Sequence, residues 1–155
     1  MSKFFLSRFN LSKHSTTTEL SFKEFYDATK LPLAVVEIAK KPFIFLLDTG
    51  SNMSILTKDV LPEIKGHYRS KSNKHLTMAG SVGTPEECNL QRVKLDLNIQ
   101  GVNTTEIMHI QNIPAFDVIK EETDTLIQGV LGSDFLAKHK AVIDFKNFII
   151  TLENE

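Results

Sequence analysis

The chain has 155 residues, of which 41% are hydrophobic and 24% are charged, and its formal net charge at pH 7 is −1. This length and composition predict one globular domain with its own core, and they exclude a collagen-like or largely disordered chain. The absence of a basic excess argues against nucleic acid as the main partner. The single cysteine excludes an internal disulfide framework.

The sequence also lacks the patterns of a secretory signal, a membrane span and a metal site. Arg8 and Lys13 interrupt the apolar residues near the start, so the expected location is cytoplasmic. No run approaches the roughly 20 apolar residues that a membrane-spanning helix needs. The five histidines lack the spacing of zinc ligands. We therefore expect no membrane association, no metal and no cofactor.

Residues 1–30 differ in character from the rest and predict an N-terminal extension. A Ser/Thr-rich stretch covers residues 12–19 and is typical of linkers and helix caps. The apolar residues of 19–30 then recur at mixed, partly helical spacing, which predicts a short helix ending before Pro32. We expect residues 31–155 to form the main domain.

The pattern after residue 31 predicts strands with little helix. Val93, Leu95, Leu97 and Ile99 alternate with polar residues, which indicates a strand with one buried face. The absence of βαβ alternation favours an all-β barrel or sandwich. The other expected elements are strands at 33–39 and 42–47, a charged loop at 121–124, an apolar run at 126–132, a short helix at 133–140 and a hairpin at 141–152.

One carboxylate, Asp48, directly follows the apolar run 43–47 and begins a tight turn with Thr49, Gly50 and Ser51. A carboxylate at the end of a buried strand is unfavourable unless it is paired or hydrogen-bonded. Glycine permits a tight turn, and hydroxyls and amides can donate to the carboxylate. An Asx-type turn that closes a hairpin would show the same tripeptide, so the tripeptide alone does not indicate catalysis.

The surroundings of this turn resemble the active site of aspartic proteases. Residues 45–51, followed by Ser54, Ile55 and Leu56, resemble the active-site strand of that family. Residues 129–132 resemble the apolar-apolar-Gly element under the catalytic loop, and residues 78–84 resemble the flap hairpin of the retroviral-type enzymes. The resemblance covers residues 31–152. It implies a retropepsin-like closed β-barrel with one short C-terminal helix.

The resemblance implies an aspartic endopeptidase, which needs two carboxylates. One removes a proton from the attacking water and the other donates a proton to the scissile carbonyl, so the pair shares a proton. Because the chain has only one such motif, the second Asp48 must come from another copy. We therefore expect a homodimer with a polypeptide substrate. The hairpin at 141–152 is the predicted interface, unless it only completes the sheet of the monomer.

The resemblance also assigns roles to single residues. Asp48, Thr49 and Gly50 form the expected catalytic loop. The Ser51 hydroxyl is expected to donate to the Asp48 carboxylate, which would lower the pKa of the pair and favour an acidic pH optimum. The expected substrate-binding residues are Asn52, Met53, Ala79, Gly80, Ser81, Val82, Gly83 and Val130.

Two departures from the retroviral pattern leave the strength of the dimer open. Asn52 and Ser133 stand where those enzymes commonly have an Asp and an Arg that form an ion pair near the interface. Because both charges are absent, neither is left unpaired. Two alternative functions also remain: a retropepsin-like module that dimerises or binds peptides with little cleavage, and a zymogen-like form whose residues 1–30 cover the cleft.

Overall fold

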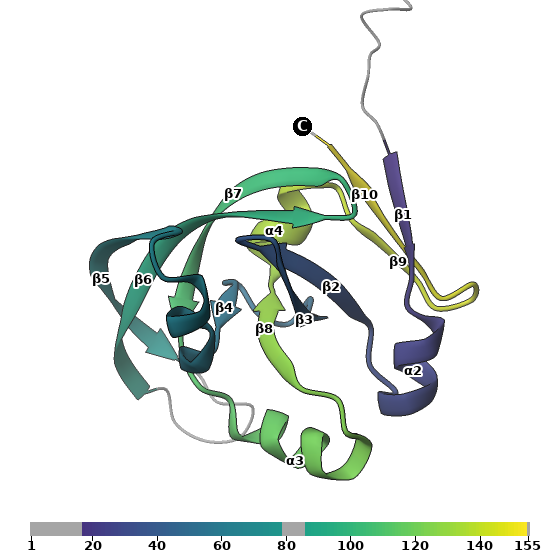
Figure 1. Cartoon of the computed structure of the whole chain (residues 1–155), viewed down its shortest axis with the longest axis horizontal. Coiled ribbons are helices and arrows are strands. Elements are labelled where there is room, and N and C mark those ends of the chain that lie inside the picture. The colour runs from purple at the N-terminus through teal and green to yellow at the C-terminus, as the bar shows by residue number, and fades with distance from the viewer. Residues whose placement is uncertain (1–16, 79–85, 155) are drawn as a thin grey trace, which may run out of the picture.

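The computed structural model describes residues 17–78 and 86–154, and strands dominate the described chain (Figure 1). None of the helices in these two ranges is long and apolar enough to cross a bilayer. The elements in chain order are β1 (Thr17–Ser21), α2 (Lys23–Thr29), β2 (Leu33–Ile38), β3 (Lys41–Leu47), β4 (Ile55–Leu56), the 3-10 helix η1 (Lys58–Ile64), β5 (Tyr68–Met78), β6 (Glu86–Ile99), β7 (Val102–Ile110), α3 (Pro114–Thr123), β8 (Ile127–Leu131), α4 (Ser133–Lys138), β9 (Val142–Asp144) and β10 (Ile149–Glu153).

Six strands close into a barrel in the order β2-β3-β8-β4-β7-β6. The barrel closes where Glu37 of β2 pairs with Asn98 of β6. β5 continues the sheet beyond β6 and pairs with it in antiparallel fashion. β8 runs parallel to β3, so the ends of these two strands lie next to each other. The structure confirms the predicted closed all-β barrel, with α4 as the short helix near the C-terminus.

One face of β3 is buried and the other is half-buried against apolar residues, which explains why the run before Asp48 is apolar throughout. Phe43, Phe45 and Leu47 point into the barrel and belong to the main core. Ile44 and Leu46 point to the other face and pack on a second apolar cluster. We call this group the second cluster; its buried members are Leu33, Met53, Ile55, Phe116, Ile127 and Val130.

A three-stranded sheet in the order β1-β10-β9 lies on one side of the barrel (Figure 1). The predicted C-terminal hairpin is confirmed as β9 and β10, and β1 of the same chain pairs with β10, with Leu20 opposite Ile150. The predicted N-terminal helix is confirmed as α2. Aromatic rings of α2 and of the β9–β10 turn pack edge to face, including Phe22 and Phe145 at 5.4 Å between ring centroids. The described part of residues 1–30 therefore packs against the C-terminal hairpin.

The expectation of a charged loop at residues 121–124 is wrong, because residues 121–123 form the last turn of α3. Pro114 occupies the first turn of this helix, where its missing N–H is not needed. Phe116 is 5% exposed and anchors α3 on the second cluster. The charged residues of α3 are exposed, and Phe116 is its buried residue. One buried residue does not produce the repeating apolar spacing by which a helix is recognised in a sequence.

Candidate active site

Asp48 begins a tight loop at the point where β3 ends. Its backbone N–H donates to Leu131 O at 3.0 Å, and its carboxylate Oδ1 accepts from Gly50 N at 2.9 Å. A Cβ atom on Gly50 would lie 3.2 Å from Asp48 Oδ1, so glycine allows the close approach. Asp48 is half-buried, whereas Thr49 and Gly50 are exposed in the single chain. The loop thus holds one carboxylate oxygen by a backbone amide and presents its tip to the surface.

The end of β8 lies directly beneath this loop. Leu47 of β3 is opposite Leu131 of β8, and the chain then passes Gly132 under the loop. A Cβ atom on Gly132 would lie 2.5 Å from Met53 O and 2.7 Å from Ser51 O. Any residue other than glycine would therefore clash with these backbone oxygens unless the backbone moved. Ser133 N donates to Ser51 O at 2.7 Å. The structure therefore places the predicted apolar-apolar-Gly element where the resemblance puts it.

The Ser51 hydroxyl does not donate to the Asp48 carboxylate in this structure. Ser51 Oγ donates instead to Met53 O at 2.7 Å. A hydroxyl carries one proton, so Ser51 Oγ does not also donate to Asp48 in this arrangement. Ser51 braces the loop here, and the acidic optimum stays a prediction.

The expected substrate-binding residues fall into three groups. Asn52 is exposed beside the loop. Met53 and Val130, at 9% and 2% exposure, lie in the second cluster and support the loop from below. Ala79, Gly80, Ser81, Val82 and Gly83 lie outside the described residues. The strands that lead into and out of this segment do form an antiparallel hairpin, with Met78 opposite Glu86.

Ser54 and Asp134 make a part-buried polar contact that the sequence did not predict. Ser54 N donates to Asp134 Oδ2 at 3.0 Å, and Ser54 Oγ donates to Asp134 Oδ1 at 2.8 Å. The same Oγ accepts from Gly132 N at 3.1 Å, and Asp134 Oδ1 also accepts from Phe135 N. Ser54 is 0% exposed, so these bonds satisfy groups that water cannot reach.

This contact joins the segment after the loop to the start of α4. The ion pair near the interface that the retroviral pattern would lead us to expect cannot form here, because Asn52 and Ser133 are uncharged. A signal was present in the sequence: Ser54 lies between Met53 and Ile55 in a stretch that reads as buried, and a buried hydroxyl needs a partner.

A metal centre finds no support in the described residues. Among residues 17–78 and 86–154, no group of three or more His, Cys, Asp or Glu side chains converges as metal ligands would.

A family model described as aspartyl protease matches residues 34–135, which is more than half of the chain and includes the Asp48 loop, β8 and the start of α4. This chain belongs to the aspartyl protease family. Among solved structures, EIAV protease complexed with the inhibitor HBY-793 is 25% identical to this aspartyl protease. The match covers 77% of this chain and 98% of that chain, with a TM-score of 0.53, so the fold is retropepsin-like. None of the curated proteins compared matches this chain.

Proposed function

We propose that this protein is a homodimeric aspartic endopeptidase in which Asp48 of two copies forms one catalytic pair. The observation that carries the proposal is the Asp48 loop itself. Its carboxylate is fixed by Gly50 N, its backbone is fixed by Leu131 O, and its Thr49-Gly50 tip is exposed in the single chain. The Gly50 contact alone is that of an Asx turn, and the family match over residues 34–135 supports the catalytic role of this loop.

In the proposed reaction one Asp48 is ionised and the other is protonated. The ionised carboxylate removes a proton from the attacking water, and the protonated one donates to the oxygen of the scissile carbonyl. Two carboxylates that lie next to each other do not both ionise readily, so in this proposal the two Asp48 side chains share one proton. Each chain supplies one member, and a two-fold axis between the copies brings the two loops together.

The edge of the terminal sheet supports an interface at residues 141–152. β9 is the outer strand of the β1-β10-β9 sheet. Val142 on this strand is 57% exposed, and Phe145 in the adjoining turn is 51% exposed. An exposed strand edge with apolar side chains is a favourable surface for a second chain. The described N-terminal residues pair with the opposite side of this sheet, through β1 and β10.

Cleavage by the Asp48→Asn variant tests the catalytic role. Both proteins are incubated with a peptide library between about pH 4 and 7, and products are read by mass spectrometry. Asp124→Asn, the same change at an exposed residue, is the matched control. We expect cleavage by the wild type and the control only. Equal products from the wild type and Asp48→Asn would refute the enzymatic role and leave the peptide-binding alternative.

Mixing the two proteins tests the shared site. If each site needs an Asp48 from both chains, activity at constant total protein should follow the square of the wild-type fraction. An equal mixture that has exchanged subunits should then retain about a quarter of the wild-type rate. A retained rate of one half, linear in the wild-type fraction, would mean that each chain works alone.

A further inference from the structure

Four cations occupy adjacent positions on the β5–β6 hairpin. The register places Arg69 opposite Lys94 and Lys71 opposite Arg92. Residues directly opposite each other in an antiparallel pair share a face, as do residues two apart on one strand. All four side chains therefore lie on one face of the hairpin. We call this group the basic face.

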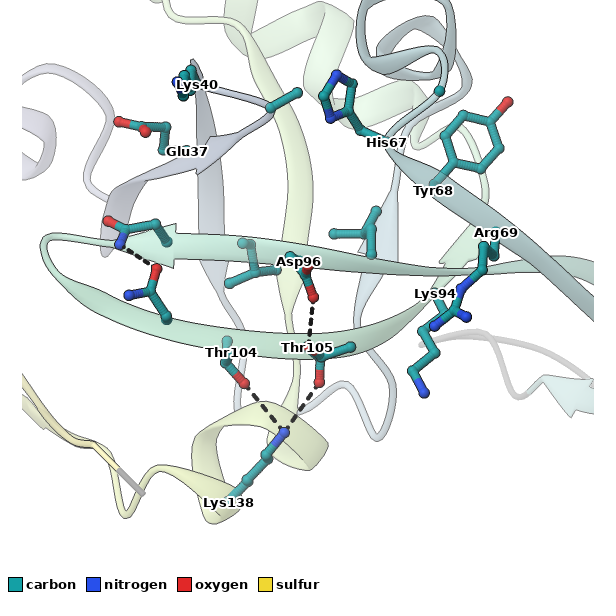
Figure 2. A pocket seen from close by; sticks show the side chains of 16 residues that line it. Glu37, Lys40, His67, Tyr68, Arg69, Lys94, Asp96, Thr104, Thr105 and Lys138 are labelled. Carbon is teal, nitrogen blue, oxygen red and sulfur yellow. Dashed lines mark hydrogen bonds between the residues drawn. The ribbon is translucent and has the colours of Figure 1, made fainter.

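The basic face is the outer face of the sheet. The alternate residues Val93 and Leu95 of β6 are buried in the main core, at 0% and 2% exposure. Arg69 and Lys71 are exposed, and Lys94 is half-buried. Figure 2 shows the side chains of Arg69 and Lys94 extending in the same direction from their two strands. Both also line an open groove of about 1330 Å³, which Lys40 and His67 line as well, together with the acids Glu37 and Asp96.

Like charges directly opposite each other destabilise a strand pair. Among the residues whose side chains the structure describes, no carboxylate forms an ion pair with Arg69, Lys71 or Lys94. Asp96, on the same face, accepts a hydrogen bond from Thr105 Oγ1. An anion supplied from outside would relieve the repulsion between Arg69 and Lys94.

The basic face is connected to the Asp48 loop through one row of paired residues. Lys71 is opposite Arg92, Arg92 is opposite His109, and His109 pairs with Ile55, whose neighbour Ser54 accepts from His109 N at 2.9 Å. Neighbouring strands lie about 4.8 Å apart, so three steps from β5 to β4 span about 14 Å. His109 and Ile55 are 8% and 6% exposed, so a bound polypeptide would pass outside this row, and about four extended residues is the shortest length that spans it.

We propose that the basic face binds acidic side chains of an extended polypeptide substrate, some four to seven residues from the bond that is cleaved. The row continues from Ile55 to Val130 and from Val130 to Leu46, near the end of β3. The five strand steps from Lys71 to Leu46 span about 24 Å, which about seven extended residues cover. That the bound polypeptide is a substrate rests on the proposed function. The anion binding itself does not need cleavage.

Binding is measured first, with the full-length Asp48→Asn protein, so that no probe is cut. The probe is a fluorescein-labelled peptide of alternating Glu and Ser, read by anisotropy, and the control peptide has Gln in place of Glu. The test variant is Arg69→Gln with Lys94→Gln. The matched control is Lys58→Gln with Lys146→Gln, which removes the same charge from exposed positions elsewhere. Urea midpoints establish that all proteins are folded.

We expect the acidic peptide to bind about three- to tenfold more weakly to the Arg69/Lys94 variant, the range that two exposed ion pairs contribute. The control variant should bind as before, and added salt should weaken binding because these charges are screened within about 10 Å at 0.1 M. Equal binding of the Gln peptide, or an equal loss in both variants, would overturn the proposal. Preferential binding of a DNA duplex of the same charge would assign the face to nucleic acid instead.

Cleavage is measured second, with wild-type protein and a sequence that the library shows to be cut. A Glu placed five residues from the scissile bond should raise kcat/KM over Gln at that position, and the Arg69/Lys94 variant should abolish the difference. If no library peptide is cut, the proposed function fails, and the binding measurement still decides whether the face takes acidic peptides.

Discussion

The contact between Ser54 and Asp134 gives the most direct test of how the Asp48 loop is held. Asp134→Ala removes the acceptor of three hydrogen bonds, two of them from the backbone N–H groups of Ser54 and Phe135. Each buried donor left without a partner costs about 1–3 kcal/mol. Ser54 is 0% exposed, but Asp134 itself is exposed, so water can reach part of the space that the carboxylate leaves. We expect the free energy of unfolding to fall by about 2–3 kcal/mol.

The conservative variant Asp134→Asn should lose less. Its amide oxygen can still accept from Ser54 Oγ and Phe135 N, but its NH2 group would face Ser54 N, which is also a donor. One bond is lost rather than three, so we expect a loss of about 1–2 kcal/mol. Urea unfolding of the full chain measures both variants, and Glu121→Ala on the exposed side of α3 should change stability by less than about 0.5 kcal/mol.

A double-mutant cycle with Ser54→Ala isolates the side-chain contact. If the Ser54 hydroxyl and the Asp134 carboxylate stabilise each other, the double variant should lose about 1–2 kcal/mol less than the sum of the two single losses. Simple additivity would show that the two side chains act independently. An Asp134→Asn loss equal to that of Asp134→Ala would show that the charge, and not the geometry of the acceptors, decides the effect.

Three further predictions follow from other parts of the chain. Gly132→Ala should destabilise the fold by about 1–3 kcal/mol and lower activity, because the new Cβ would meet Met53 O at 2.5 Å; an unchanged urea midpoint would contradict this. Phe116→Ala should lower the free energy of unfolding by about 3–5 kcal/mol, since it removes an aromatic ring from the second cluster beneath α3; a loss below 1 kcal/mol by calorimetry would show that neighbouring side chains repack into the space. The Asn147 side chain, with backbone N–H groups, lowers the pKa of Asp144. A folded-state pKa below the unfolded value stabilises above the unfolded pKa, and the effect is lost as pH falls through the folded pKa. Asn147→Ala should therefore lower Tm at neutral pH and converge with the wild type in acid; parallel curves throughout would contradict this.

Local patterns predicted the elements whose character depends on nearest neighbours. Alternation along β6 identified the buried side of the strand, and Val93, Leu95, Leu97 and Ile99 are all at most 3% exposed. The carboxylate after an apolar run, followed by Gly50, located the tight loop at the end of β3. These signals are readable because side-chain direction in a strand repeats every two residues and because a turn needs particular residue types.

Other features depend on residues far apart in the sequence. Leu20 pairs with Ile150 at opposite ends of the chain, and no local pattern specifies that partner. The charged stretch at 121–123 became helical because Phe116 found an apolar cluster assembled from other elements. In both cases the energy comes from burial against distant residues, which overrides local propensity.

The sequence by itself determined that one carboxylate follows a buried strand, that an apolar-apolar-Gly element exists, and that a short helix comes after it. Only the tertiary structure decided how these parts are held. In the folded chain the Ser51 hydroxyl donates a hydrogen bond to Met53 O, and Asp134 links the segment after the loop to the start of α4. A hydroxyl can donate once and the buried N–H and hydroxyl of Ser54 need partners, so the choice of partner follows from which groups the folded chain brings within about 3 Å.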